Sequence, residues 1–279
     1  MRALLAAHGL RPSRALGQHY LVDPNTARKV VRLAQVEAGE TVLEVGPGLG
    51  SLTLALREAG ALVVAVEADA RLLPALAEAL GDDPGVRVVR ADAVRADLAA
   101  LAPEARRLVA NLPYNIAATL VLRVLTDYPR YRWLTVMVQR EVGERLAAAA
   151  GTSAYGATSA KVAALAEARL LAPVSRKVFL PEPHVDSVLV SLTRTAEHPA
   201  LAGVAWATLD RVIDAAFSQR RKTLRNSLRT LGLGPDEVEA LGRAAGVDLG
   251  LRAERLDVSA FAALARALEA TAASDKSTF

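Results

Sequence analysis

The segment TVLEVGPGLGS, residues 41–51, joins an apolar run of strand length to a helical pattern through a glycine-rich loop. Residues 41–45 have the length and apolar content of a buried strand, and the periodicity from Ser51 to Ala59 predicts an amphipathic helix. Glycines let a ligand approach the loop backbone closely. A helix that begins after such a loop presents free amide groups to an anion. The segment therefore predicts a strand, a binding loop and a helix of an α/β fold.

Strand and helix patterns continue to alternate after this segment. Further strands are predicted over residues 62–66, 86–89, 108–110, 133–138 and 187–192, with helical patterns between most of them. This alternation is typical of a parallel sheet with crossover helices, in which ligands bind outside the carboxyl ends of the strands. From about residue 200 the pattern is helical only. We therefore expect a Rossmann-like domain over residues 1–195 and a smaller all-helical domain over residues 196–279.

The composition excludes several classes of protein. The chain has 279 residues, of which 52% are hydrophobic and 23% charged, so it is not a disordered chain. It has no cysteine, which excludes disulfides, thiol catalysis and iron–sulfur clusters, and its four histidines form no metal-ligand spacing. Uninterrupted apolar runs are too short for a secretory signal or a membrane span. We expect a cytoplasmic monomer without a metal ion, and a net charge of +4 is compatible with a polyanionic partner.

Three strand ends carry groups that suit an adenosine cofactor. The loop containing Gly46 and Gly48 has Ser51 where a dinucleotide fingerprint requires a glycine, so it fits a carboxylate better than a pyrophosphate. Glu67 follows at the interval of an acid that binds both ribose hydroxyls, and Asp92 can accept a hydrogen bond from an adenine amino group. Each feature alone also fits a plain turn or a solvated carboxylate. Together they predict a pocket for S-adenosylmethionine.

The tetrapeptide Asn111-Leu112-Pro113-Tyr114 follows the fourth predicted strand. It places an amide oxygen, a backbone carbonyl and an aromatic face beside the expected sulfonium. The lone pair of an adenine N6 is delocalised into the ring, so acceptors for its two protons favour the tetrahedral nitrogen of the transition state. A turn initiated by Asn111 is the alternative, but it leaves the tyrosine unexplained. The motif therefore predicts methylation of an exocyclic amine.

This tetrapeptide resembles the motif of amino methyltransferases in the form found in ribosomal RNA adenine N6-dimethyltransferases. Further agreement with that family comes from residues 16–21, 139–142, 179–187 and 217–228, so the resemblance covers nearly the whole chain. It is strongest to the KsgA-type branch. The resemblance implies transfer of methyl groups from S-adenosylmethionine to two adjacent adenines near the 3′ end of small-subunit rRNA, with the immature 30S subunit as partner.

The resemblance also implies roles for particular residues. His19 and Leu21 would line the cofactor pocket together with Gly46, Gly48, Glu67, Asp92 and Asn111. Asn111, the Leu112 carbonyl and Tyr114 would hold the target adenine, with Phe179 stacked on its other face. The family more often has Asn-Phe where this chain has His19-Tyr20, and His19 has the alternative of capping a loop. Phe179 has the alternative of packing in the core.

The basic residues between positions 220 and 229 are predicted to lie along one arginine-rich helix. Its basic residues are either a solvated face or a contact to the rRNA backbone, which the resemblance favours; they are Arg220, Arg221, Lys222 and Arg225, followed by Arg229. Two other functions remain open. One is methylation of a single adenine of large-subunit rRNA, which confers macrolide resistance. The other is a ribosome-assembly or nucleic-acid-binding factor that has kept the fold without catalysis.

Overall fold

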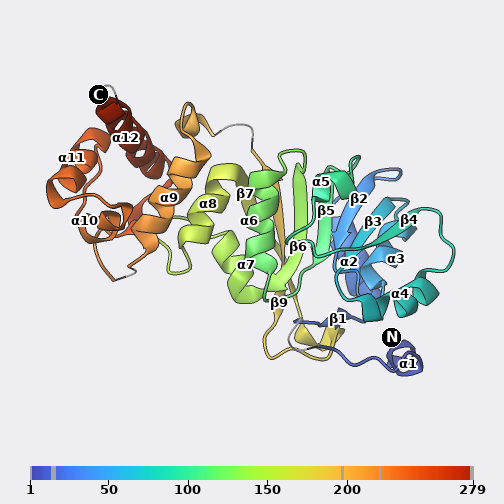
Figure 1. Ribbon diagram of the computed structural model, residues 1–279. Coiled ribbons are helices and arrows are strands. Elements are labelled where there is room, and N and C mark those ends of the chain that lie inside the picture. Colours follow the sequence, from blue (N-terminus) through green and yellow to red (C-terminus); the bar gives the residue numbers. More distant parts are fainter. Residues whose placement is uncertain (1, 14–16, 196–197, 220, 277–279) are drawn as a thin grey trace. The chain divides into compact units, whose positions relative to one another are not determined.

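The computed structural model describes residues 2–13, 17–195, 198–219 and 221–276. The chain forms two compact units, shown along the chain in Figure 1. Unit 1 comprises residues 1–144 and 168–194, and unit 2 comprises residues 145–167 and 195–279. No helix of the described segments is long and apolar enough to cross a membrane.

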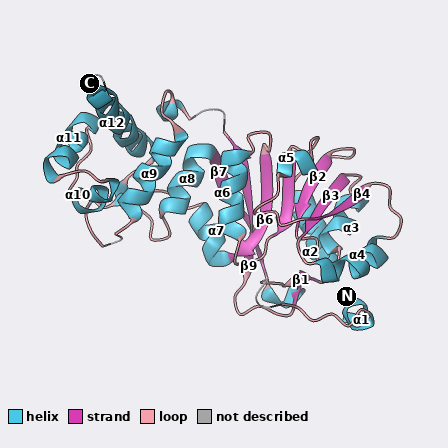
Figure 2. Cartoon of the chain, in the orientation of Figure 1, coloured by secondary structure: helices cyan, strands magenta, loops and turns pink. Residues whose placement is uncertain are grey.

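Unit 1 is built on a sheet of seven strands in the order β4-β3-β2-β5-β6-β9-β7 (Figure 2). The neighbouring strands from β4 to β6 are parallel, and β9 runs antiparallel to β6. The strands are β2 (Thr41–Val45), β3 (Leu62–Glu67), β4 (Val86–Arg90), β5 (Arg107–Asn111), β6 (Trp133–Gln139), β7 (Ala166–Val174) and β9 (Ser187–Arg194). The predicted α/β sheet is confirmed, and each predicted strand exists within a few residues of its expected bounds.

Helices cover the sheet because their apolar stripes pack on its buried side chains. Val30 and Leu56, from α2 and α3, share one buried cluster with Val42 and Val109 of the sheet. The helices of this unit are α1 (Arg2–Ala7), α2 (Pro24–Leu33), α3 (Ser51–Glu58), α4 (Leu73–Leu80), α5 (Leu98–Leu101), α6 (Ala117–Asp127) and α7 (Arg140–Leu146). This packing fixes where the strand ends open into loops.

Three strands were not predicted. β7 lies at the edge of the sheet and has few fully buried positions, so it lacks the apolar run of an inner strand. β1 (Tyr20–Leu21) and β8 (Phe179–Leu180) are each two residues long. They pair with each other although they lie far apart in the sequence. Elements of this length carry no periodicity, and only tertiary pairing creates them.

Unit 2 contains helices, with an apolar core that includes Leu209, Ile213 and Phe261. Its α-helices are α8 (Ala157–Leu165), α9 (Trp206–Phe217), α10 (Leu224–Ser227), α11 (Pro235–Ala245) and α12 (Val258–Lys276). The structure has a boundary at Thr195, next to the predicted division of 1–195 and 196–279, but residues 145–167 group with unit 2 rather than with the first domain. Tyr155 and Ala160 pack in the same core as α9, a contact between distant segments that sequence patterns do not reveal.

The prediction that the basic residues between positions 220 and 229 lie along one helix is wrong. α9 ends at Phe217, and α10 begins only at Leu224. The Ser218 hydroxyl donates to the Ala215 carbonyl at 2.7 Å, which satisfies a carbonyl at the end of α9. The Lys222 amide then donates a hydrogen bond to the Gln219 carbonyl, so the chain turns before α10 begins. Of the described basic residues, Arg221 and Lys222 therefore lie between α9 and α10, Arg225 lies on α10, and Arg229 lies in the 3-10 helix Leu228–Leu231.

Candidate active site

A pocket of about 310 Å³ lies where the carboxyl ends of β2, β3, β4 and β5 meet. Its lining contains most of the expected contacts of this domain: His19, Leu21, Gly46, Gly48, Glu67, Asp92, Asn111, Leu112 and Tyr114. The position agrees with the rule that open parallel sheets bind ligands at this edge. Among the described side chains, no group of three or more His, Asp or Glu could hold a metal ion.

Gly48 lines this pocket and brings the loop backbone close to Tyr20. Its φ of 57° lies in the left-handed region, and a Cβ built on it would stand 2.9 Å from Tyr20 Cδ1. The Gly48 amide donates to Glu67 Oε2 at 3.2 Å, which ties the loop to the end of β3. The loop therefore approaches its neighbours more closely than any side chain would permit.

Glu67 and Asp92 reach the pocket in different surroundings. Glu67 is buried, its Oε1 accepts a hydrogen bond from the Asp69 amide at 2.8 Å, and burial raises the pKa of its carboxyl. Asp92 is about half exposed, and its Oδ1 accepts a hydrogen bond from the Val94 amide at 2.9 Å. Both side chains can accept hydrogen bonds from a ligand at the same edge of the sheet.

Glu44 is a pocket residue that sequence reasoning missed. Its side chain is 1% exposed, and Oε2 has no hydrogen-bond partner in the described part of the chain. Burial raises the pKa of this carboxyl to about 8, with a further contribution from the charge of Glu67. The available signal was one charged residue within an otherwise apolar strand. An unpaired carboxyl oxygen at a pocket wall fits a ligand that carries positive charge.

Asn111, at the end of β5, has a fixed orientation. Its Nδ2 donates to the His19 carbonyl at 3.0 Å. Because a carbonyl oxygen only accepts, the amide nitrogen must face His19, and Oδ1 must face the other way as an acceptor. The next residue, Leu112, donates its amide to the Met137 carbonyl at 3.1 Å, which anchors the motif to β6. The structure thus presents Oδ1 as a hydrogen-bond acceptor.

Tyr114 is held by contacts from two distant segments. Its ring stacks on His19 with centroids 5.0 Å apart and an angle of 28° between planes. The hydroxyl groups of Tyr114 and Ser187 lie 3.0 Å apart, and burial raises the pKa of the Tyr114 phenol. His19 Nδ1 in turn donates to the Pro181 carbonyl at 2.8 Å. Segment 179–187 therefore supports the site through Pro181 and Ser187, two roles that the sequence did not reveal.

Phe179 is not brought to the pocket. Its side chain is 3% exposed and packs in the core with Leu21, Val174 and Leu189. Phe179 is not among the lining residues of the pocket, and the structure supports the alternative of core packing. The physical reason is the pairing of β8 with β1, which places Phe179 opposite Leu21.

The basic residues of segment 220–229 have different surroundings. Arg221 and Lys222 are exposed, whereas Arg225 forms an ion pair with Glu239 of α11. Lys222 and Arg229 also line a polar pocket of this unit together with Gln219 and Asn226. Arg220 lies outside the described residues.

Residues 10–269 match the family described as ribosomal RNA adenine dimethylase. The chain belongs to this family. A ribosomal RNA small subunit methyltransferase A of Thermobifida fusca is 46% identical over 271 residues, which are 95% of this chain and 93% of the relative. The protein of the same name from Phenylobacterium zucineum is 45% identical over 268 residues, 96% of this chain and 92% of the relative.

Two solved structures resemble the chain. A dimethyladenosine transferase from Plasmodium falciparum superposes with a TM-score of 0.74 at 24% identity, covering 88% of this chain and 96% of that structure. The 23S rRNA methyltransferase ErmE gives a TM-score of 0.64 at 26% identity, covering 90% and 99%. These likenesses confirm the predicted fold class. Family membership confirms the predicted enzyme class, an rRNA adenine dimethyltransferase with S-adenosylmethionine as methyl donor.

Proposed function

We propose that unit 1 dimethylates N6 of adenines in small-subunit rRNA and that Asn111 Oδ1 orients the amine that receives the methyl groups. The observation that carries this proposal is the direction of the Asn111 amide, whose nitrogen is committed to the His19 carbonyl. An acceptor is thereby presented at the pocket without any cost of reorientation during the reaction. The Leu112 carbonyl is the second acceptor.

S-adenosylmethionine supplies a methyl group activated by a sulfonium. Glu67 would bind the ribose hydroxyls and Asp92 would accept from the adenine amino group. The amides of Gly46, Gly48 and Gly50 already donate within the protein, so the loop of residues 46–50 would contribute close backbone approach to the cofactor. The unpaired Glu44 Oε2 is the observation that fits a cationic ligand, because a positive charge would stabilise the ionised carboxyl.

The two acceptors act on the protons of the target amine. They favour the pyramidal nitrogen, whose lone pair is then free of the purine ring, while the Tyr114 ring holds the base in line. No strong base is needed, because the methylated ammonium loses its proton readily to water. After the first transfer the amine retains one proton, so one of the two acceptors suffices to orient it for the second.

The small-subunit substrate is supported by the names of relatives that are 45–46% identical, against 26% for the 23S enzyme ErmE. We extend the proposal to the immature 30S subunit as partner, to a cytoplasmic monomer, and to unit 2 as a contact for the rRNA backbone. Exposed Arg221 and Lys222 support that contact, since cations near phosphates supply affinity without sequence choice. The base pocket and the shape of the RNA then select the adenines.

The decisive experiment compares substrates. The protein is incubated with labelled S-adenosylmethionine and unmethylated small or large subunits, and the RNA is digested to nucleosides. We expect N6,N6-dimethyladenosine from small subunits only. Label confined to large subunits would replace this function with that of the ErmE type, and no label in either RNA would favour the non-catalytic assembly factor.

A further inference from the structure

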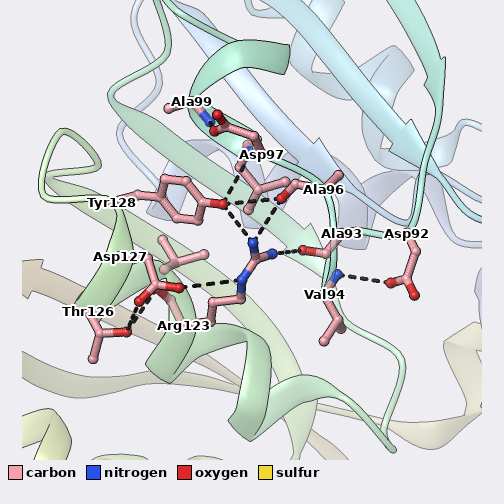
Figure 3. Close-up of polar contacts among 12 residues, drawn as sticks. Asp92, Ala93, Val94, Ala96, Asp97, Ala99, Arg123, Thr126, Asp127 and Tyr128 are labelled. Carbon is pink, nitrogen blue, oxygen red and sulfur yellow. Dashed lines mark hydrogen bonds and ion pairs between the residues drawn. The ribbon is translucent and has the colours of Figure 1, made fainter.

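The Arg123 guanidinium from α6 and the Tyr128 hydroxyl hold the loop that carries Asp92 (Figure 3). Arg123 Nη1 donates to the Ala93 carbonyl at 2.7 Å, and Nη2 donates to the Ala96 carbonyl at 3.0 Å. Nη2 also donates to the Tyr128 hydroxyl at 2.8 Å, and that hydroxyl donates to the Ala96 carbonyl at 3.1 Å. One side chain thus fixes two carbonyls of the loop.

Asp92 depends on this loop for its own position. Its side chain contacts are local, with the Val94 amide 2.9 Å from Oδ1 and Arg95 Nε 3.6 Å from Oδ2. Its carbonyl accepts from the amides of Arg95 and Ala96 at 2.9 and 2.8 Å. The carboxylate therefore lies wherever the turn of residues 92–96 places it.

The chemistry of Arg123 suits a positioning role. A guanidinium is planar and always charged, so its donors hold two acceptors at a fixed separation, which an ammonium group cannot do. The Arg123 side chain is 21% exposed, and Asp127 Oδ2 lies 3.5 Å from its Nε. The charge is thus balanced within α6, and the remaining donors face the loop.

We propose that Arg123 is a positioning residue for recognition of the cofactor's adenine, acting through the loop that presents Asp92. This inference rests on the proposed function, in which Asp92 accepts from the adenine amino group. Arg123 is not among the residues that line the pocket. Because Arg123 is part of α6, its hydrogen bonds to the Ala93 and Ala96 carbonyls fix the Asp92 loop, and with it the carboxylate, relative to this helix.

The test measures how strongly the protein distinguishes adenine from hypoxanthine. S-inosylhomocysteine has a carbonyl in place of the amino group of S-adenosylhomocysteine, and calorimetry gives the dissociation constant of each. We expect the wild type to prefer the adenosyl ligand by about tenfold or more, the value of one hydrogen bond to a charged group. Arg123→Ala and Asp92→Asn should each reduce this preference severalfold.

Arg194→Ala is the matched control. Arg194 donates to the Leu125 carbonyl at 2.8 Å and to the Tyr131 carbonyl at 3.2 Å, so it holds carbonyls near the end of α6 without touching the Asp92 loop. We expect this variant to lose thermal stability while keeping the wild-type ligand preference. A merely structural role of Arg123 would give the same result for both arginine variants.

The outcomes distinguish failure of the positioning role of Arg123 from failure of the proposed enzymatic function. If Asp92→Asn lowers the preference and a folded Arg123→Ala keeps it, the positioning role is overturned. An unchanged preference in Asp92→Asn overturns the Asp92 assignment and this inference together, while methyl transfer tested through Asn111 still decides the enzymatic function. If Arg123→Ala does not fold, Arg123→Lys and Tyr128→Phe are judged by the same ratio, since each keeps part of the network.

Discussion

The functional groups of this site are defined at the scale of single residues by the hydrogen bonds that they already make. Asn111 is an acceptor for a ligand because its nitrogen donates to His19, and Tyr114 is held because its ring and hydroxyl both have partners. His19 stands where the family more often has asparagine, and the structure shows what it contacts. It contributes its carbonyl to Asn111 and its ring to Tyr114, so its imidazole has a supporting role rather than a loop cap alone.

Asn111→Ala removes the oriented acceptor. We expect methyl transfer to fall by about a hundredfold or more, as for other single groups that stabilise a transition state, while RNA binding stays within a few-fold. Single-turnover transfer and filter binding measure the two effects. Asn111→Asp is the control, because it keeps an acceptor but cannot donate to His19. Near-normal transfer by the alanine variant would contradict the proposed role.

Glu44 predicts a pH dependence of stability. Its folded pKa of about 8 is above the ordinary 4.5, so between these values the folded protein holds a proton that the unfolded chain has released. Stability contributed by this group is therefore complete below about pH 4.5 and decreases as the pH rises to about 8. Denaturant midpoints of wild type and Glu44→Gln across this range measure the difference. Identical slopes in both proteins would contradict it.

The same carboxyl predicts proton release on cofactor binding. A positive ligand favours the ionised form of Glu44, so binding near neutral pH should release a proton that Glu44→Gln does not release. Calorimetry in buffers of different ionisation enthalpy counts these protons. Glu67, whose pKa is raised by burial, is present in both proteins, so the protons that it releases are counted in both measurements. Equal release from wild type and variant would show that Glu44 stays protonated.

At the scale of elements, loops at strand ends bring the site together, and short segments support it from a distance. The loop after β2 passes close to Tyr20 of β1, the Pro181 carbonyl accepts from His19, and the Ser187 hydroxyl contacts that of Tyr114. Each of these contacts joins segments that lie far apart in the sequence. The elements therefore act as a frame for a few polar atoms.

Gly48→Ala tests this frame. The new Cβ would meet the Tyr20 ring at 2.9 Å, and the residue keeps a φ of 57° that alanine resists, so we expect weaker cofactor binding and a loss of about 1 kcal/mol or more in stability. Gly81→Ala is the matched control. It has a similar φ of 59° with nothing within 4 Å of the added carbon. It should lose stability without losing cofactor affinity, and equal affinity loss in both would refute the explanation.

At the scale of the whole molecule, unit 2 is the proposed RNA contact. Reversing the charges of Arg221 and Lys222 should weaken rRNA binding and lower the slope of log affinity against log salt by about one to two phosphate contacts. Arg211 and Arg243 are exposed cations of the same unit and serve, reversed together, as the control for net charge. Binding titrations at several salt concentrations measure both. An unchanged slope in the first pair would make it a solvated face.

Prediction from the sequence was good for features that local patterns encode. The inner strands and the glycine loop are short-range signals, and the polar residues after β2, β3, β4 and β5 meet because parallel strands bring their carboxyl ends to one edge. It was poor for the 217–228 segment, where arginine has good helix propensity but the chain turns after Phe217. Prediction also missed Glu44, because a charged residue within a strand does not show which groups its side chain will contact in the folded protein.

Periodicity, turn chemistry and motifs within a few residues are enough to predict the α/β order of elements, the edge of the sheet that holds the pocket, and the family. Three features come from long-range packing instead: Phe179 lies in the core, residues 145–167 pack with unit 2, and Arg123 reaches the Asp92 loop. These are contacts between segments far apart in the chain. Their energy comes from burial and fixed hydrogen bonds in three dimensions, which no local pattern records.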